Sequence, residues 1–243
     1  MQIIKLDAID STNTYLRQLS VAKALKDFTV VSAQYQKEGR GQMGTTWQSQ
    51  PSKNLMFSVF KDVSFLKVNQ NYAISMVVAL ALMKTLKLFS IKKVQIKWPN
   101  DILSEQKKVG GILIENILKQ NTLKASIIGV GLNVNQTEFT DLPQASSLRL
   151  ISGKNHDLDE ILFAFIQQLK EGFQNMKAQS FLDLKRDYET NLFRKNKPST
   201  FKDAEGNTFT GIIKGVTDSG RLRVLVEDDI IKEYEHKTIT LLY

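Results

Sequence analysis

The stretch Val94-Gln95-Ile96-Lys97-Trp98-Pro99-Asn100-Asp101 shows most directly what kind of fold this chain adopts. Apolar and polar side chains alternate from Val94 to Trp98, which is typical of a strand. Pro99 ends that strand, so Asn100 and Asp101 follow at its carboxyl end, where sheet proteins place ligand groups. Lys97 leaves the strand on the face opposite Trp98. A polar turn that only caps the strand remains an alternative interpretation.

Strand and helix patterns lie on both sides of this stretch. β-Branched or apolar runs predict strands at 3–6, 28–32, 54–60, 111–115 and 125–129. Helical spacing predicts helices after Asp10-Ser11-Thr12-Asn13 and over 71–89, 157–176 and 181–191. The helix over 157–176 has one apolar face, consisting of Leu158, Ile161, Leu162, Phe165, Ile166 and Leu169.

The pattern changes after Asn191. Five short β-type runs follow within about 50 residues, separated by turns such as Glu205-Gly206-Asn207 and Asp218-Ser219-Gly220. Short, closely spaced strands are typical of a small β-barrel. We therefore expect a first domain over 1–191 and a second over 192–243.

Composition excludes several classes of protein. The chain has 243 residues, a net charge of +8 and no cysteine, so disulfides, thiol nucleophiles and cysteine-bound metals are excluded. The N-terminal residues lack the apolar core of a signal peptide, and the apolar run 73–82 is short for a membrane span. These features suit a cytoplasmic protein and predict no membrane contact. The positive charge fits nucleic acid, phosphates with an acidic partner, or ordinary surface lysines.

The segment Gly39-Arg40-Gly41-Gln42-Met43-Gly44 formally matches a dinucleotide-binding motif. That motif needs a helix to begin at the glycines, whereas residues 45–51 favour loop or strand. We interpret the segment as a phosphate-binding loop, because glycine backbone amides can converge on an anion and Arg40 adds a permanent charge. Trp47 could stack on an adenine. An ordinary glycine-rich turn with a core tryptophan is the alternative.

Two further segments combine glycines with polar residues. In the first, Lys108 precedes Gly110 and Gly111, which open a strand that ends at Glu115. In the second, Gly129, Gly131 and Asn133 fall at alternate positions and share one face. Glycine in a strand often marks the close approach of a ligand, and two missing side chains make a slot. A hairpin with an exposed lysine and a β-bulge are the respective alternatives.

Together, in this order, these segments resemble the biotin–protein ligase family. The resemblance is carried by 10–13, Gln36 with 39–41, Trp47, 97–101, Lys108 with 110–115, and 129–133. It implies an α/β (α+β) fold of the class II synthetase and biotin–lipoate ligase type: a mixed sheet flanked by helices, followed by an SH3-like barrel. It also implies activation of biotin with ATP and Mg²⁺ as biotinyl-5'-AMP, then transfer to a lysine of a biotin carboxyl carrier protein.

The resemblance assigns roles residue by residue. The implied biotin-binding residues are Ser11, Thr12, Asn13, Gln36, Gly39, Arg40, Gly41, Gly111, Gly129 and Gly131. The implied ATP- or adenylate-binding residues are Gln42, Trp47, Lys97, Asn100, Lys108 and Asn133. The implied catalytic residues are Arg40, Lys97, Lys108 and Asp101, with Asp101 orienting the acceptor lysine or accepting its proton. No metal-ligating protein residues are predicted.

The sequence departs from the family at two places. Many members carry a basic residue where Gln42 stands, so we expect weaker retention of the adenylate or a compensating basic residue elsewhere. Some members carry a DNA-binding domain before the catalytic core, but here Ser11 comes almost at once. We therefore expect no DNA partner. The oligomeric state, monomer or homodimer, stays open.

Three other functions compete with biotin ligation as an interpretation of the sequence. A lipoate–protein ligase has a related fold and chemistry, but usually carries an arginine followed by three glycines, which this sequence lacks. A non-catalytic module that binds nucleic acid or protein would leave 97–101 and the glycine slots unexplained. A dinucleotide oxidoreductase lacks the required helix after Gly39.

Overall fold

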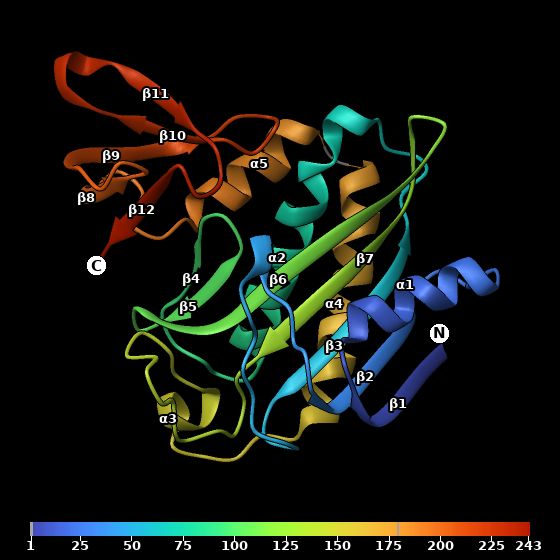
Figure 1. Cartoon of the computed structure of the whole chain (residues 1–243). Helices are drawn as coiled ribbons and strands as arrows, with labels where there is room; N and C mark the ends of the chain where they lie inside the picture. Colours follow the sequence, from blue (N-terminus) through green and yellow to red (C-terminus); the bar gives the residue numbers. More distant parts are fainter. Residues whose placement is uncertain (1, 179) are drawn as a thin grey trace.

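The computed structural model describes residues 2–178 and 180–243, whose strands form two sheets (Figure 1). The seven strands of the larger sheet are β1 (Gln2–Ile9), β2 (Thr29–Gln36), β3 (Leu55–Asp62), β4 (Val94–Lys97), β5 (Asp101–Ser104), β6 (Lys107–Lys119) and β7 (Thr122–Leu132). The five strands of the smaller sheet are β8 (Pro198–Asp203), β9 (Thr208–Val216), β10 (Leu222–Leu225), β11 (Ile231–Tyr234) and β12 (Ile239–Leu242).

The larger sheet is mixed, with the strand order β1-β2-β3-β7-β6-β5-β4. β1 and β2 pair in parallel, and the other neighbours pair antiparallel. β6 and β7 form a long hairpin whose two turn residues, Gln120 and Asn121, both have positive φ. Such a turn follows the natural twist of the strands. The hairpin brings the predicted glycine segments of β6 and β7 side by side.

Helices cover both faces of this sheet, as the sequence resemblance implied. α1 (Thr12–Ala22) lies on one face, where Leu16 packs with Val31 and Ile127. α2 (Tyr72–Leu88) and α4 (Leu158–Ala178) lie on the other (Figure 1). Neighbouring residues of a strand point to opposite faces, so Val30 joins the α2 side of the core while Val31 joins the α1 side.

Helix α2 is apolar on nearly all sides because it runs through the interior. By length and composition alone, Val68–Leu88 is long and apolar enough to cross a membrane, longer than the run 73–82 suggested. However, 72% of its apolar window is buried inside the protein. A core helix packed between a sheet and other helices accounts for that composition.

Helix α4 has the apolar stripe predicted for it, and Ile161, Leu162 and Phe165 are fully buried. α5 (Phe181–Thr190) follows and leads to the smaller sheet. Two short elements were not predicted, α3 (Leu148–Ser152) and β5. α3 is too short to show a helical period, and in β5 the two apolar residues are adjacent and show no alternation.

The smaller sheet packs against the first domain through specific contacts. Trp98 Nε1 donates to the Gly220 carbonyl oxygen at 2.9 Å, and Val216 N donates to Glu189 Oε1 at 2.9 Å. Gly220 has φ +92°, and a Cβ there would overlap the Tyr72 ring. One continuous core reaches from α2 to Phe201, Leu222 and Val224. The boundary predicted at 191 lies between α5 and β8 and stays a prediction.

Candidate active site

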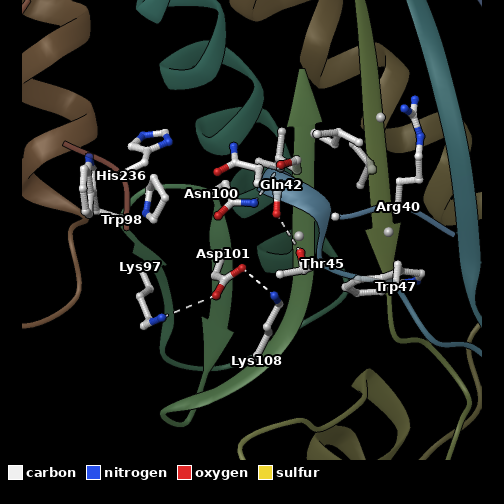
Figure 2. A pocket seen from close by; sticks show the side chains of 18 of the residues that line it. Arg40, Gln42, Thr45, Trp47, Lys97, Trp98, Asn100, Asp101, Lys108 and His236 are labelled. Atoms are coloured by element: carbon white, nitrogen blue, oxygen red, sulfur yellow. Dashed lines mark hydrogen bonds and ion pairs between the residues drawn. The ribbon is translucent and has the colours of Figure 1, made fainter. Parts of the chain in front are cut away.

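A cavity of about 300 Å³ lies between the larger sheet, the loop 40–47 and the smaller sheet (Figure 2). Most of the predicted site residues line it. They are Ser11, Thr12, Asn13, Gln36, Arg40, Gly41, Gln42, Trp47, Lys97, Asn100, Asp101, Lys108, Gly111, Gly129 and Gly131. Gly39 and Asn133 are not part of its wall. Residues that lie up to 120 positions apart in sequence therefore meet around one space.

One end of the cavity is a network of small polar side chains. Ser11 caps helix α1, since its side chain accepts from the Thr14 amide. Both the amide and the hydroxyl of Thr12 donate to Gln36 Oε1, at 2.8 and 3.0 Å. Ser58, which was not predicted, lies within hydrogen-bonding distance of Thr12 and Asn13. The helix start and the end of β2 thus hold hydroxyls and an amide together, which can bind a group with several donors and acceptors.

Three glycines form one wall, here called the glycine face: Gly111 of β6 with Gly129 and Gly131 of β7. Gly111 and Gly131 are paired across the two strands. A Cβ on Gly131 would lie 2.5 Å from the Trp47 ring, and one on Gly129 would overlap the Asn13 amide. Glycine is therefore required for close approach, as predicted. Gly110 faces the other side of the sheet, toward Leu132 and Ile102.

The loop over the glycine face is held by its own backbone. Gly41 N donates to the Thr45 carbonyl at 2.6 Å, and Trp47 N donates to the Gly39 carbonyl at 2.8 Å. Side chains at these two glycines would overlap Thr45 and the Trp47 backbone. The glycines lead into a single 3-10 turn, η1 (Gln42–Gly44), instead of an α-helix. The dinucleotide motif is therefore excluded here, and Gly39 acts through the shape of the loop.

Two lysines and one aspartate form a charged cluster beside the glycine face, where a Cβ on Gly111 would lie 3.7 Å from Lys108 Nζ. Asp101 Oδ1 lies 2.6 Å from Lys108 Nζ, and its Oδ2 lies 3.5 Å from Lys97 Nζ (Figure 2). Lys97 pairs with Asp101 across β4 and β5. Asn100 Nδ2 donates to the Ile112 carbonyl at 2.9 Å, which ties this turn to β6. Asn100 is thus anchored by β6 while it borders the cavity.

A further ion pair joins the loop 40–47 to the polar end of the cavity. Arg40 Nη2 lies 3.0 Å from Glu115 Oε2, and Asn13 Nδ2 donates to the same oxygen at 2.8 Å. Glu115 belongs to the segment 110–115 that carries the family resemblance, but no binding or catalytic role was predicted for it. A carboxylate at the end of an otherwise apolar strand was the available signal. The three predicted cations are therefore all paired with carboxylates.

Three buried side-chain polar atoms lack hydrogen-bond partners among the described residues, and two of them belong to predicted site residues, Trp47 Nε1 and Asn133 Oδ1. The Asn133 amide nitrogen donates to the Ser146 carbonyl at 3.1 Å, so its oxygen is held in a fixed direction. The Trp47 ring lies 5.8 Å from Lys108 Nζ. An unsatisfied buried polar atom is costly unless a ligand or water completes it.

Sequence comparison decides the family. The model of the biotin/lipoate A/B protein ligase family matches residues 6–133, and that of the biotin protein ligase C-terminal domain matches residues 196–240. The chain belongs to the biotin/lipoate A/B protein ligase family. The predicted resemblance and the predicted fold are both confirmed.

Individual relatives agree with this assignment. The bifunctional ligase/repressor BirA of Bacillus spizizenii is 28% identical over 239 residues, which cover 96% of this chain and 72% of that protein. The biotin–[acetyl-CoA-carboxylase] ligase of Paracoccus denitrificans is 29% identical over 88% of this chain and 90% of its own. The structure of the Aquifex aeolicus biotin protein ligase in complex with biotin and ATP has a TM-score of 0.81, 28% identity and coverage of 99% and 98%. This ligase family is thus matched over both domains.

The smaller domain of this ligase contributes residues that sequence reasoning missed. His236 lines the cavity, and its ring meets Trp98 edge-on at 5.0 Å between centroids (Figure 2). Burial lowers the pKa of His236, against a smaller opposing effect of Glu235. The Tyr243 ring lies 5.4 Å from Lys97 Nζ, and burial, with a contribution from Asp101, raises the pKa of Tyr243 to about 12. No local motif marks such residues, because they meet the site only through folding.

Proposed function

We propose that this chain activates biotin with ATP as biotinyl-5'-AMP, with release of pyrophosphate, and transfers biotin to a lysine of a biotin carboxyl carrier protein. The observation that supports this best is one cavity that combines the glycine face with Arg40, Lys97 and Lys108. A narrow apolar slot beside several cations suits a small carboxylic acid that reacts with a nucleotide. We expect the reaction to take place in the cytoplasm.

The polar end of the cavity would bind the ureido ring of biotin. A ureido group has two N–H donors and one strong acceptor, which hydroxyls and amides can satisfy. Ser11, Thr12 and Gln36 provide such groups, and Asn13 holds its place through Glu115. The valeryl chain would lie along the glycine face, where Gly41 and the loop close over it. Biotin's carboxylate would then point toward Arg40 and the two lysines.

In the first half-reaction, a carboxylate oxygen of biotin forms a bond to the α-phosphorus of ATP, and the bond to the leaving pyrophosphate breaks. Two anions must meet, so cations lower the barrier. Arg40, Lys97 and Lys108 would exchange their carboxylate partners for substrate oxygens. Trp47 would stack on adenine, and Gln42, Asn100 and Asn133 would contact the nucleotide.

Magnesium would enter with the nucleotide. No group of three or more acidic or histidine side chains that could hold a metal ion occurs within the described residues. Mg²⁺ commonly binds one or two carboxylates together with substrate phosphates, and Asp101 offers a carboxylate in the cavity wall. When bound, Mg²⁺ would neutralise phosphate charge. Asp101 would have to loosen its contact with Lys108 to take part.

In the second half-reaction, the acceptor amine attacks the acyl carbon, an amide bond forms and AMP leaves. A free lysine amine has a reference pKa of about 10.4 and is mostly protonated at neutral pH. It must lose one proton before or during the attack. Asp101 lies between Lys97 and Lys108 at the cavity wall and would orient the incoming ammonium or accept its proton.

A lipoate–protein ligase is the second candidate, because the family model covers both substrate classes. The match of residues 196–240 to the biotin protein ligase C-terminal domain favours biotin. ATP–pyrophosphate exchange with Mg²⁺ tests the choice, run with biotin, with lipoate and with neither acid. We expect exchange with biotin only. Exchange with lipoate only would show that the contacts assigned to the ureido ring of biotin are wrong. No exchange with either acid would favour a non-catalytic binding module.

A further inference from the structure

A second hollow, of about 650 Å³, lies beside the active-site cavity. We call it the Arg194 groove. It is lined by Lys93, Gln95, Glu105, Gln106, Phe193, Arg194 and Lys197. Phe193 belongs to the walls of both spaces. The groove therefore opens next to the site where the proposed reaction takes place, between the β4–β5 hairpin and the segment that leads into β8.

The groove is positively charged. Lys93, Arg194 and Lys197 face a single carboxylate, Glu105, which lies 3.3 Å from Lys93 Nζ. Neither Arg194 nor Lys197 forms an ion pair within residues 2–178 and 180–243. Arg194 Nε is buried and has no hydrogen-bond partner there. Arg194 as a whole is only partly buried, so its guanidinium places a permanent positive charge at the groove wall that no carboxylate of the described residues offsets.

Strand β4 connects the groove with the active site. Gln95 and Lys97 are two residues apart, so their side chains share one face of the strand, and both are partly exposed. Gln95 lines the groove, whereas Lys97 lines the active-site cavity and contacts Asp101. A molecule seated in the groove would thus extend directly toward the cluster of Lys97 and Asp101.

We propose that the Arg194 groove binds carboxylate side chains of the acceptor domain that lie near its target lysine. This inference rests on the proposed function, which requires a protein to bring a lysine into the cavity. The target lysine is itself a cation and approaches a site with three cations. Acidic residues beside it, bound by Lys93, Arg194 and Lys197, would offset that repulsion and fix its direction. Charges at such a rim act mainly through the rate of association.

The test separates the two half-reactions. We compare the wild type with the double variant Lys93→Glu/Lys197→Glu and, separately, with Arg194→Gln. The assay measures transfer of biotin from preformed biotinyl-AMP to a biotin carboxyl carrier domain. We expect the KM for the carrier to rise about tenfold in the double variant at low salt, and less above 0.5 M salt, because salt screens exposed charges. Pyrophosphate exchange with biotin should stay unchanged in both variants, which shows that they fold and form the adenylate.

Lys23→Glu is the matched control. Lys23 is exposed and follows α1, which packs against β2, β3 and β7, whereas β5 and β4 form the far edge of the sheet. It changes the net charge without touching the groove. An unchanged KM for the carrier in the groove variants, or an equal rise in Lys23→Glu, would overturn the proposal. Binding to heparin, a general polyanion, is measured on the same variants. If the groove variants lose heparin binding while their KM for the carrier stays unchanged, the proposal is overturned and the groove is assigned to another polyanion. Absence of exchange in the wild type would refute the proposed function itself.

Discussion

At the scale of single residues, the three cations of the site are each paired with a carboxylate. Arg40 is paired with Glu115, and Lys97 and Lys108 share Asp101. A cation without a partner in a partly buried site is unfavourable, so these carboxylates stabilise the three cations. In the proposed reaction, substrate oxygens would replace them. Gln42, where the family resemblance led us to expect a basic residue, lines the same cavity without adding a charge.

Gln42→Arg should therefore slow the release of biotinyl-AMP. An added charge near the adenylate phosphate is worth about 1 kcal/mol in a solvated site, which corresponds to about fivefold slower dissociation. The rate is measured by chasing labelled adenylate from the enzyme. Gln48→Arg serves as the control, since Gln48 is exposed on the same loop and is not part of the cavity wall. Equal rates in the wild type and in Gln42→Arg would contradict the idea that this position limits retention.

At the scale of secondary structure, three adjacent strands assemble the charged cluster. β4 carries Lys97, β5 begins at Asp101, and β6 carries Lys108. The pairing of β5 with β6 shifts register between Ile102 and Leu103, which places Leu103 opposite Lys108. Such an irregularity re-aims side chains along a strand. The cluster thus depends on strand register more than on any one loop.

Lys108→Ala should abolish adenylation while biotin binding survives. Removing a cation that stabilises developing charge costs about 100-fold or more in rate, but the polar end of the cavity stays intact. Pyrophosphate exchange reports the first effect and calorimetric titration with biotin the second. Lys107→Ala is a close control, because Lys107 is exposed and its Nζ donates to the Pro143 carbonyl. Normal exchange by Lys108→Ala would remove Lys108 from its assigned role.

Elements with a regular hydrophobic pattern could be predicted from the sequence because such patterns are local. The stripe of α4 and the alternation in β4 needed no knowledge of tertiary structure. β5 was missed because its two apolar residues, Ile102 and Leu103, are adjacent and show no alternation. Spacing alone predicted the shared face of Gly129 and Gly131, and the family resemblance implied that Gly111 joins it. The partners of its glycines, Trp47 and Asn13, were not, because contacts between distant segments leave no local signal.

At the scale of the whole molecule, the second domain forms part of the wall of the candidate active site. His236 lines the cavity and packs on Trp98, which in turn donates to Gly220. The core is continuous between the two domains. The site therefore depends on how the domains pack together.

Acidification should weaken this packing through His236. Its folded-state pKa is lowered by burial, so below the unfolded-state value of about 6.5 the unfolded chain binds more protons. The contribution of His236 is fully present above that pH and is lost as the pH falls. We expect the wild type to lose more stability between pH 8 and pH 5 than His236→Phe, by urea midpoints. His156, whose pKa is also lowered, is present in both proteins, so its contribution cancels in the comparison. Parallel losses in the two proteins would exclude this role.

The chain contains two tryptophans, and their positions give the protein built-in optical probes. Trp47 lies on the glycine face, and Trp98 lies where the smaller domain meets the larger. Indole emission depends on local polarity and on nearby quenching groups. The tryptophan emission of this chain therefore comes from the glycine face and the domain contact alone. In Trp98→Phe, all remaining tryptophan emission would come from the loop over the slot, so ligand entry can be followed without any attached dye.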